Sequence, residues 1–253
     1  MIQTPIYIDS SDHGPFKEND NDNFKILLPQ DFRYSHGDWR CAVSSITFRN
    51  GFKIMQDLEM KFNVYHYDDE DLTRIEEFEI PSILRSHDEI IDYFKDKIIN
   101  VATCTKTVSN QIKIVFKEKI VLKIDKHLAV ILGCNNFTNN YQMIARIKGG
   151  VYISPLKIQN INLFPAQLYV TCSFVEHSVV AGSMSPLLKI VPLSDQTDNQ
   201  YLTIDFGHSL EFVPVRLTDL KVLEFKIKSH TDKSPGFIDK KSPLYMSLIF
   251  QKF

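Results

Sequence analysis

The sequence lacks the features that would place it in a membrane or on a secretory route. No stretch reaches the roughly 18 apolar residues that a membrane-spanning helix needs. The first 30 residues contain no apolar signal segment, because charged residues interrupt them: Asp9, Asp12, Lys17, Glu18 and Asp20. We therefore expect a chain that is made in the cytoplasm or nucleus and is not secreted.

Cysteine is scarce. The four cysteines are widely spaced and lie within or beside apolar segments: Cys41, Cys104, Cys134 and Cys172. Buried, reduced thiols have this distribution. We expect free thiols, with disulfide bonds as the alternative, and hence a reducing compartment.

An excess of positive charge is also missing. The chain has 29 Lys and Arg against 31 Asp and Glu, a net charge of −2, whereas neutralising nucleic-acid phosphates normally requires a basic excess. We therefore do not expect the chain as a whole to bind nucleic acid. A local basic stripe is better explained as a strand whose lysines face water while Phe225 faces the core: Lys221, Lys226, Lys228, His230 and Lys233.

Metal and cofactor motifs are absent. None of the eight histidines has a second His or a Cys at the spacing of a preorganised metal site: His13, His36, His66, His87, His127, His177, His208 and His230. The acidic run Asp68–Asp71 lacks the Gly and the terminal Glu of a calcium-binding loop and is interpreted as a hairpin turn. No glycine-rich phosphate loop occurs. We predict neither a metal site nor a cofactor.

Catalytic motifs are not found either. Gly182–Pro186 contains a serine but lacks the closing Gly of a nucleophile elbow, and we interpret it as a loop. Glu176 and His177 are adjacent in a predicted strand, so they point to opposite faces. We predict no catalytic residue and no enzyme. The open alternative is a metal-dependent enzyme on a β scaffold, which would require His66, His177 and His208 to converge.

A two-residue hydrophobic period recurs from end to end. It is clearest in Ile112–Phe116 and Leu223–Lys228, where apolar residues alternate with lysine or glutamate. Further predicted strands are Phe24–Leu28, Trp39–Phe48, Met60–Tyr67, Ile120–Ile124, Val151–Ile158, Leu168–Val175, Leu187–Val191, Tyr201–Phe206 and Leu244–Phe250. So many short strands predict an all-β sandwich or barrel. No linker composition marks a boundary, so we expect one elaborated domain over residues 1–253.

Two segments predict helix instead. Ser86 and Glu89 form a capping box, after which apolar residues fall on one helical face: Ile90, Phe94, Ile98 and Val101. Asp125 is a candidate cap for a short turn through Leu128, Ile131 and Leu132, with Gly133 as its left-handed end. We expect a helix-containing excursion at about 82–135.

Two sets of residues, in a fixed order about 130 residues apart, resemble a known family. The N-terminal set is Ser10-Ser11, Phe16, Asn19, Asn21, Asn23-Phe24, Leu27-Leu28-Pro29 and Gly37–Val43; the C-terminal set is Leu168–Cys172, Val175-Glu176, Gly182, Pro186–Pro192 and Phe212–Val215. They resemble the minor capsid (penton) proteins of Polinton (Maverick) transposable elements and of related adintovirus- and virophage-like DNA viruses. Arg40, Cys41 and Ala42 depart from the family's strand pattern but keep its length and hydrophobic phase. Residues 45–150 match only in a Ser-capped helix and the turn at Ile131-Leu132-Gly133.

The resemblance implies a single jelly-roll sandwich and a structural role. Such pentons form homopentamers at the fivefold vertices of an icosahedral capsid, beside a separate double jelly-roll major capsid protein, so it implies a location in the virion. It carries over no catalytic or interface residue.

Other readings remain open. Phe16, Phe48 and Phe52 lie at predicted strand edges or loops, where they would be either interface anchors or core residues. A domesticated or surface-exposed β-sandwich that binds a receptor, a glycan or a protein is the alternative function.

Overall fold

The chain contains two compact units in the computed structural model. The described residues are 3–11, 15–16, 18–33, 38–54, 60–68, 71–84, 86–117, 120–134, 142–147, 150–159, 161, 163–180, 182–193, 200–216, 219–229 and 234–252. Met1–Lys53 and Phe164–Phe253 together form one unit, called here the sandwich unit, and Ile54–Leu163 forms the other, called the inserted unit.

The sandwich unit is built from two antiparallel sheets. Sheet A contains, in order, β1 (Gln3–Asp9), β18 (Tyr245–Lys252), β3 (Trp39–Arg49) and β15 (Tyr201–Asp205), and β16 (Val213–Pro214) also pairs with β3. Sheet B contains, in order, β14 (Leu187–Pro192), β11 (Gln167–Cys172), β17 (Asp219–Ser229) and β2 (Asn23–Arg33). A small hairpin, β12 (Ser178–Val180) and β13 (Ser183–Ser185), lies outside both sheets.

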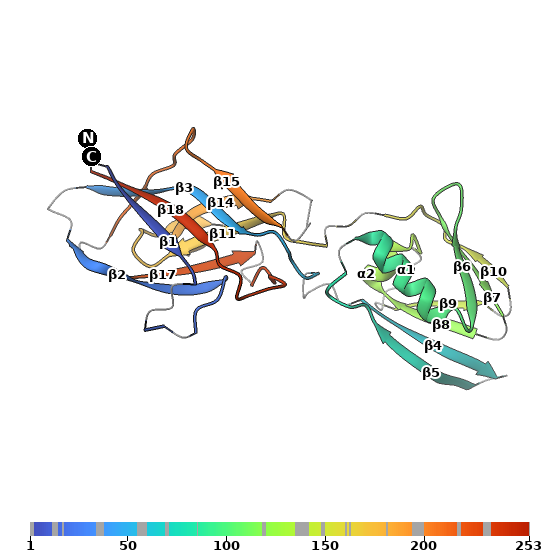
Figure 1. Ribbon diagram of the computed structural model, residues 1–253. Helices are drawn as coiled ribbons and strands as arrows, with labels where there is room; N and C mark the ends of the chain where they lie inside the picture. The colour runs from blue at the N-terminus through green and yellow to red at the C-terminus, as the bar shows by residue number, and fades with distance from the viewer. Residues whose placement is uncertain are drawn as a thin grey trace. The chain divides into compact units, whose positions relative to one another are not determined.

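The order of these strands is that of a jelly roll. If the eight strands of sheets A and B are numbered along the chain without β16, sheet A has the order 1-8-3-6 and sheet B the order 2-7-4-5. The first strand therefore pairs with the last, along Gln3↔Gln251 to Asp9↔Tyr245, as the blue and red ends of the chain in Figure 1 show. The predicted all-β fold and single jelly roll are confirmed.

The alternating residues of these strands create the core of the sandwich. In β17, Leu223, Phe225 and Ile227 are buried while Lys226 between them is exposed, as the period of two requires. The ring of Phe225 stacks on Phe24 of β2, with centroids 5.1 Å apart. Each fully buried side chain of this size stabilises the fold by about 1.5–3 kcal/mol.

The inserted unit has two sheets and two helices. One sheet contains, in order, β5 (Asp71–Glu79), β4 (Lys61–Asp68), β8 (Ile120–Asp125) and β9 (Gln142–Ile147), and the other contains β10 (Val151–Ile153), β7 (Ile112–Phe116) and β6 (Ala102–Lys106). The helices are α1 (His87–Ile98) and α2 (Lys126–Ile131). The expectation of one elaborated domain over residues 1–253, with a helix-containing excursion at about 82–135, stays a prediction; both helices lie in the inserted unit. Residues 54–163 bury apolar side chains of their own, and no change in composition marks their boundaries.

Helix α1 begins where the sequence predicts. The backbone N–H of Glu89 donates to the hydroxyl of Ser86 at 3.1 Å, and Ile90, Phe94 and Ile98 are buried. Phe94 packs edge-on against Phe62 of β4, with centroids 4.9 Å apart. Val101, expected on the same helical face, lies beyond the end of the helix.

Helix α2 has the predicted end but not the predicted cap. Gly133 has a φ of +69°, which is the left-handed conformation that glycine adopts without steric cost. Asp125 makes no side-chain capping bond; its carboxylate instead accepts the backbone N–H of Lys61 at 2.8 Å. The aspartate therefore joins β8 to the start of β4.

The four cysteines are free, as predicted. Burial raises the pKa of the Cys104 and Cys134 thiols, each to about 11. Burial also raises the pKa of Cys41 and Cys172. All four thiols are therefore protonated at neutral pH.

Gly133 provides a test of the packing in the inserted unit. A Cβ at this position would lie 2.3 Å from the carbonyl oxygen of Leu156, whereas a Cβ at Gly182, which also has a positive φ of +83°, would meet nothing within 4 Å. We predict that Gly182→Ala lowers the free energy of unfolding by about 1–2 kcal/mol through backbone strain alone. Gly133→Ala should lower it by about 2–5 kcal/mol, since overpacking adds to the strain. Urea unfolding followed by circular dichroism measures both, and equal losses would contradict this packing.

Candidate functional site

The described residues bring together no cluster of metal-binding side chains. No group of three or more His, Cys, Asp or Glu that could hold a metal occurs among them. His66 lies in β4 of the inserted unit, while His177 and His208 follow β11 and β15 of the sandwich unit. Glu176 and His177 are both exposed.

Two acidic or serine-containing segments form hairpins. Asp68 of β4 pairs with Asp71 of β5, as expected for a hairpin. Residues 69–70, the middle of the acidic run, lie outside the described residues. Gly182–Pro186 was expected to be a loop. Instead Ser183–Ser185 form β13, which pairs with β12, because the left-handed Gly182 reverses the chain between the two strands.

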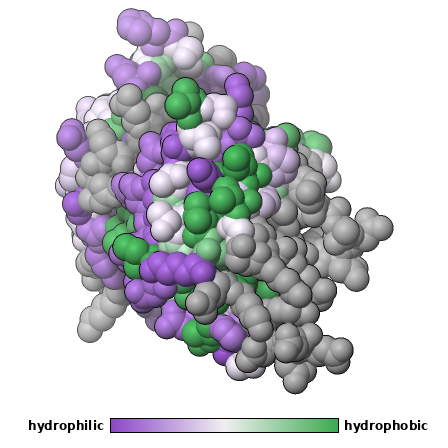
Figure 2. Space-filling view, turned by 90° about the vertical axis from the view of Figure 1, so that its right-hand side faces the viewer, coloured by the Kyte–Doolittle hydropathy of each residue, from purple (hydrophilic) through white to green (hydrophobic). Residues whose placement is uncertain are grey.

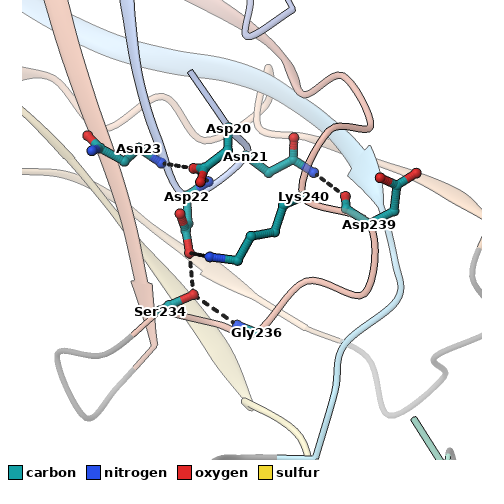
Figure 3. Close-up of polar contacts among 8 residues, drawn as sticks. All are labelled: Asp20, Asn21, Asp22, Asn23, Ser234, Gly236, Asp239 and Lys240. Carbon is teal, nitrogen blue, oxygen red and sulfur yellow. Dashed lines mark hydrogen bonds and ion pairs between the residues drawn. The ribbon is translucent and has the colours of Figure 1, made fainter. Parts of the chain in front are cut away.

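A network of polar contacts, which we call the polar clamp, joins the segment before β2 to the segment before β18. Asn21 donates its side-chain N–H to the carbonyl oxygen of Asp239 at 3.0 Å and its backbone N–H to that of Lys240 at 3.0 Å. Figure 3 shows the hydrogen bond between the side chain of Asn21 and Asp239. Since β2 belongs to sheet B and β18 to sheet A, the clamp ties the two sheets together at this point.

Asp22 is the charged centre of the clamp. Its carboxylate accepts hydrogen bonds from the hydroxyl of Ser234 and, at 3.3 Å, from the ammonium of Lys240. Asp20 has a local role instead, because its carboxylate accepts the backbone N–H groups of Asp22 at 3.2 Å and Asn23 at 2.9 Å. Figure 3 shows the two carboxyl groups near each other, both away from the side chain of Asn21.

The two carboxyl groups have opposite pKa shifts. Burial, a side-chain hydrogen bond with Asp22 and the charge of Asp22 raise the pKa of Asp20 above its ordinary value of 3.8. Burial also acts to raise the pKa of Asp22, but hydrogen bonds from Asp20 and Ser234, together with the charge of Lys240, outweigh it and hold that pKa below 3.8. Asp22 is thus the carboxyl that stays ionised.

Further contacts close the same end of the sandwich. Asn19 and Lys25 exchange two hydrogen bonds, from the amide of Asn19 to the carbonyl oxygen of Lys25 at 2.8 Å and from the Lys25 N–H back to Asn19 at 2.9 Å. Leu244, just before β18, donates its N–H to the hydroxyl of Ser10 at 2.8 Å. Ser10, Asn19, Asn21 and Asn23-Phe24 are among the residues of the N-terminal set described above, so this part of the set forms a turn and a tie between the sheets.

A second tie between the sheets involves a buried lysine. Lys189 of β14 is only 6% exposed, and its ammonium lies 2.6 Å from the carboxylate of Glu211. It also lies 4.4 Å from the ring centroid of Phe206, the residue after β15. Sheet B is thereby connected to the chain that leaves sheet A.

The two sheets present different outer faces. The outer face of sheet A, called face A, carries hydroxyl side chains, two carboxylates and two arginines: Tyr7, Asp9, Arg40, Ser45, Thr47, Arg49, Tyr201, Thr203, Asp205, Tyr245 and Ser247. The outer face of sheet B, called face B, carries a mixture of lysine, glutamate and apolar residues: Lys25, Leu27, Tyr169, Ile190, Val222, Glu224, Lys226 and Lys228. These faces are candidate contact surfaces.

The inserted unit has an apolar patch of its own. On the outer side of the sheet β10-β7-β6, Val115 pairs with Val151, and Ile153 follows on the same side; the three are 38%, 57% and 50% exposed. Figure 2 shows a face on which hydrophobic residues lie together among hydrophilic ones.

Of the two alternatives given for Phe16, Phe48 and Phe52, core burial holds for Phe48 and Phe52. Phe48 and Phe52 are 0% and 1% exposed and pack with Phe237 in the core, because Phe48 lies on the inner side of β3 and Phe52 pairs with Phe237 in a β-bridge. Phe16 is half-buried, and its role as an anchor stays a prediction. Exposed Tyr7, Tyr201 and Tyr245 were not selected from the sequence, although Tyr7 alternates with the buried Ile6 and Ile8.

The fold is shared with known capsid proteins. A crystal structure of the mavirus penton protein matches with a TM-score of 0.51 and 8% sequence identity, over 100% of both chains. A chain of the Sputnik virophage matches with a TM-score of 0.51 and 9% identity, over 99% of this chain and 97% of that one. No family model and no curated protein matches the sequence. Within the described residues, no helix has the length and apolar character needed to cross a membrane.

The opposite pKa shifts in the clamp predict opposite effects of two substitutions. Asp20→Asn keeps an oxygen for the two backbone N–H groups and removes a negative charge beside Asp22. Because the pKa of Asp20 is raised in the folded state, ionising Asp20 destabilises the fold as the pH rises through that pKa. Asp20→Asn removes this cost, so it should raise the free energy of unfolding by up to about 1 kcal/mol between pH 4 and 7, after allowing for solvent screening.

Asp22→Asn should have the reverse effect. A lowered folded pKa means that ionised Asp22 stabilises the fold above the unfolded value of 3.8, and this contribution disappears as the pH falls through the folded pKa. We expect a loss of about 1–2 kcal/mol at pH 7 that shrinks below pH 4. Urea unfolding across this pH range measures both variants. Equal effects of the two would refute the division of roles.

Proposed function

We propose that the chain is a structural minor capsid (penton) protein that forms homopentamers at the fivefold vertices of an icosahedral capsid. The observation that carries the proposal is the full-length likeness to the mavirus penton protein, together with the jelly-roll strand order of the sandwich unit. The ordered sequence motifs that resemble the penton family give independent support.

The sandwich unit has the physical properties that a ring subunit needs. Its eight main strands enclose one continuous hydrophobic core, and the polar clamp and Lys189 tie the sheets at their ends. A subunit of this kind keeps its shape when neighbours pack on it. Cyclic pentamers use one patch against a different patch on the next copy, so the ring closes, and the unlike faces A and B offer two such patches.

The proposed function requires no reaction. Its mechanism is assembly, in which apolar contacts between subunits supply affinity and polar rims supply specificity. The expected second partner is a separate double jelly-roll major capsid protein, and the expected location is the virion. Synthesis in the cytoplasm or nucleus of a host and descent from a Polinton-type element are parts of the same proposal.

The native mass of the full chain tests the proposal. We expect particles of five chains by light scattering, and fivefold rings by negative-stain electron microscopy, either for the chain alone or after co-expression with a double jelly-roll major capsid protein. High salt should weaken the polar part of the contact more than the apolar part.

A chain that remains monomeric in both preparations would contradict the penton assignment. The alternative, a β-sandwich that binds a receptor, a glycan or a protein, would then become the working model.

A further inference from the structure

Among the tyrosines whose side chains are described, the exposed ones lie on one face of the sandwich unit. Of the tyrosines whose side chains are described, Tyr65, Tyr93, Tyr152 and Tyr169 are half-buried, while Tyr7, Tyr201 and Tyr245 are 80%, 52% and 43% exposed. All three exposed rings belong to face A. A folded chain that exposes large aromatic rings in one place usually does so at a contact surface.

The pairing register brings these tyrosines close together. Tyr7 pairs with Ser247 and the neighbouring Asp9 pairs with Tyr245, so the two tyrosines are diagonal neighbours, which lie about 7–8 Å apart in antiparallel sheets. Tyr245 also pairs with Thr47, and Thr47 pairs with Thr203 on β15, the strand that carries Tyr201. Hydroxyl side chains thus fill the space between the rings.

Face A contains little uncommitted charge. The Asp9 carboxylate accepts the N–H and the hydroxyl of Ser11, and the Asp205 carboxylate accepts the N–H of Gly207 at 2.7 Å. No lysine occurs among the residues of face A; its two carboxylates are matched by Arg40 and Arg49, and Arg49 lies 3.1 Å from the Asp239 carboxylate, so the face is close to neutral. Tyrosine enrichment with depletion of charge is the composition of the core of a protein–protein interface.

Face B has the complementary composition. Leu27 and Val222 pair directly and are 42% and 39% exposed. Beside them, Lys25 and Lys226 lie 3.7 Å and 3.4 Å from the Glu224 carboxylate. Lys228 adds another positive charge. The apolar pair Leu27 and Val222 therefore lies beside a group of charged residues with a net positive charge.

We propose that face A of one copy of this chain docks on face B of the next copy, with the tyrosines of face A against Leu27 and Val222. This inference rests on the proposed penton function and names the surfaces of its ring. Charge favours the pairing of unlike faces, because B against B would bring lysines together, whereas face A is close to neutral and offers aromatic rings to the lysines of face B. Each copy uses one face for each neighbour, which is the heterologous contact that a closed ring needs.

Single charge insertions on the full-length chain test the docking. Tyr7→Arg alters face A and Leu27→Arg alters face B, each at an exposed position. Val108→Arg is the matched control, since Val108 is fully exposed in the turn between β6 and β7. All three variants should melt within a few degrees of the wild type, which shows that they fold.

The expected result is a loss of rings for both face variants. Each should raise the concentration needed for half-assembly at least about 30-fold, the effect of losing one interface hot spot, while Val108→Arg assembles like the wild type. Mixing Tyr7→Arg with Leu27→Arg in equal amounts leaves one intact pair of faces between the two chains. The mixture should form heterodimers and no rings.

Three results would overturn the inference. Rings that survive both face variants, or that the Val108 control also loses, would place the contact elsewhere. Rings formed by Leu27→Arg but not by Tyr7→Arg would mean that face A docks on itself. A wild-type chain that forms no ring, alone or with the major capsid protein, would defeat the penton function and this inference together, whereas intact rings in the face variants would defeat this inference alone.

Discussion

Contact between aromatic rings across the sandwich is the interaction on which the rest of the structure depends. Phe174, which follows β11 of sheet B, lies 5.4 Å from Phe250 of β18 in sheet A and 6.3 Å from Phe225 of β17. Because side chains alternate along a strand, burial of these rings fixes which residues of each strand face outward. The composition of faces A and B is therefore a consequence of the core. A one-residue slip in β1, for example, would bury Tyr7 and expose Ile6 and Ile8.

The polar clamp complements the apolar core at one end of the sandwich. An apolar core alone does not specify where chains enter and leave the sheets, whereas hydrogen bonds of fixed geometry do. Asn19, Asn21 and Ser10 are among the few described polar residues that are nearly fully buried. Asn21 and Ser10 bond to backbone groups of the segment before β18, and Asn19 bonds to the backbone of Lys25 within the turn. This explains in physical terms why short polar motifs far apart in the sequence could indicate a common fold.

The sequence predicted the strands with clear alternation and missed those without it. β1 contains Pro5 and only two inward isoleucines, and β5 is largely acidic and exposed, so its pairing with β4 is a tertiary property. The strand expected over Val151–Ile158 ends at Ile153, and Pro155, which has no N–H to donate, follows shortly after. Burial of Phe48 and Phe52 depended on partners such as Phe237, almost 200 residues later. The candidate surfaces were beyond reach for the same reason, because face A combines strands from both ends of the chain.

The measurement that tests the central claim most directly is cryo-electron microscopy of particles assembled from this chain and a double jelly-roll major capsid protein. The account predicts density for five copies at each vertex, each containing a sandwich with the sheet orders β1-β18-β3-β15 and β14-β11-β17-β2. Vertices filled by another protein, with this chain absent from the shell, would contradict it.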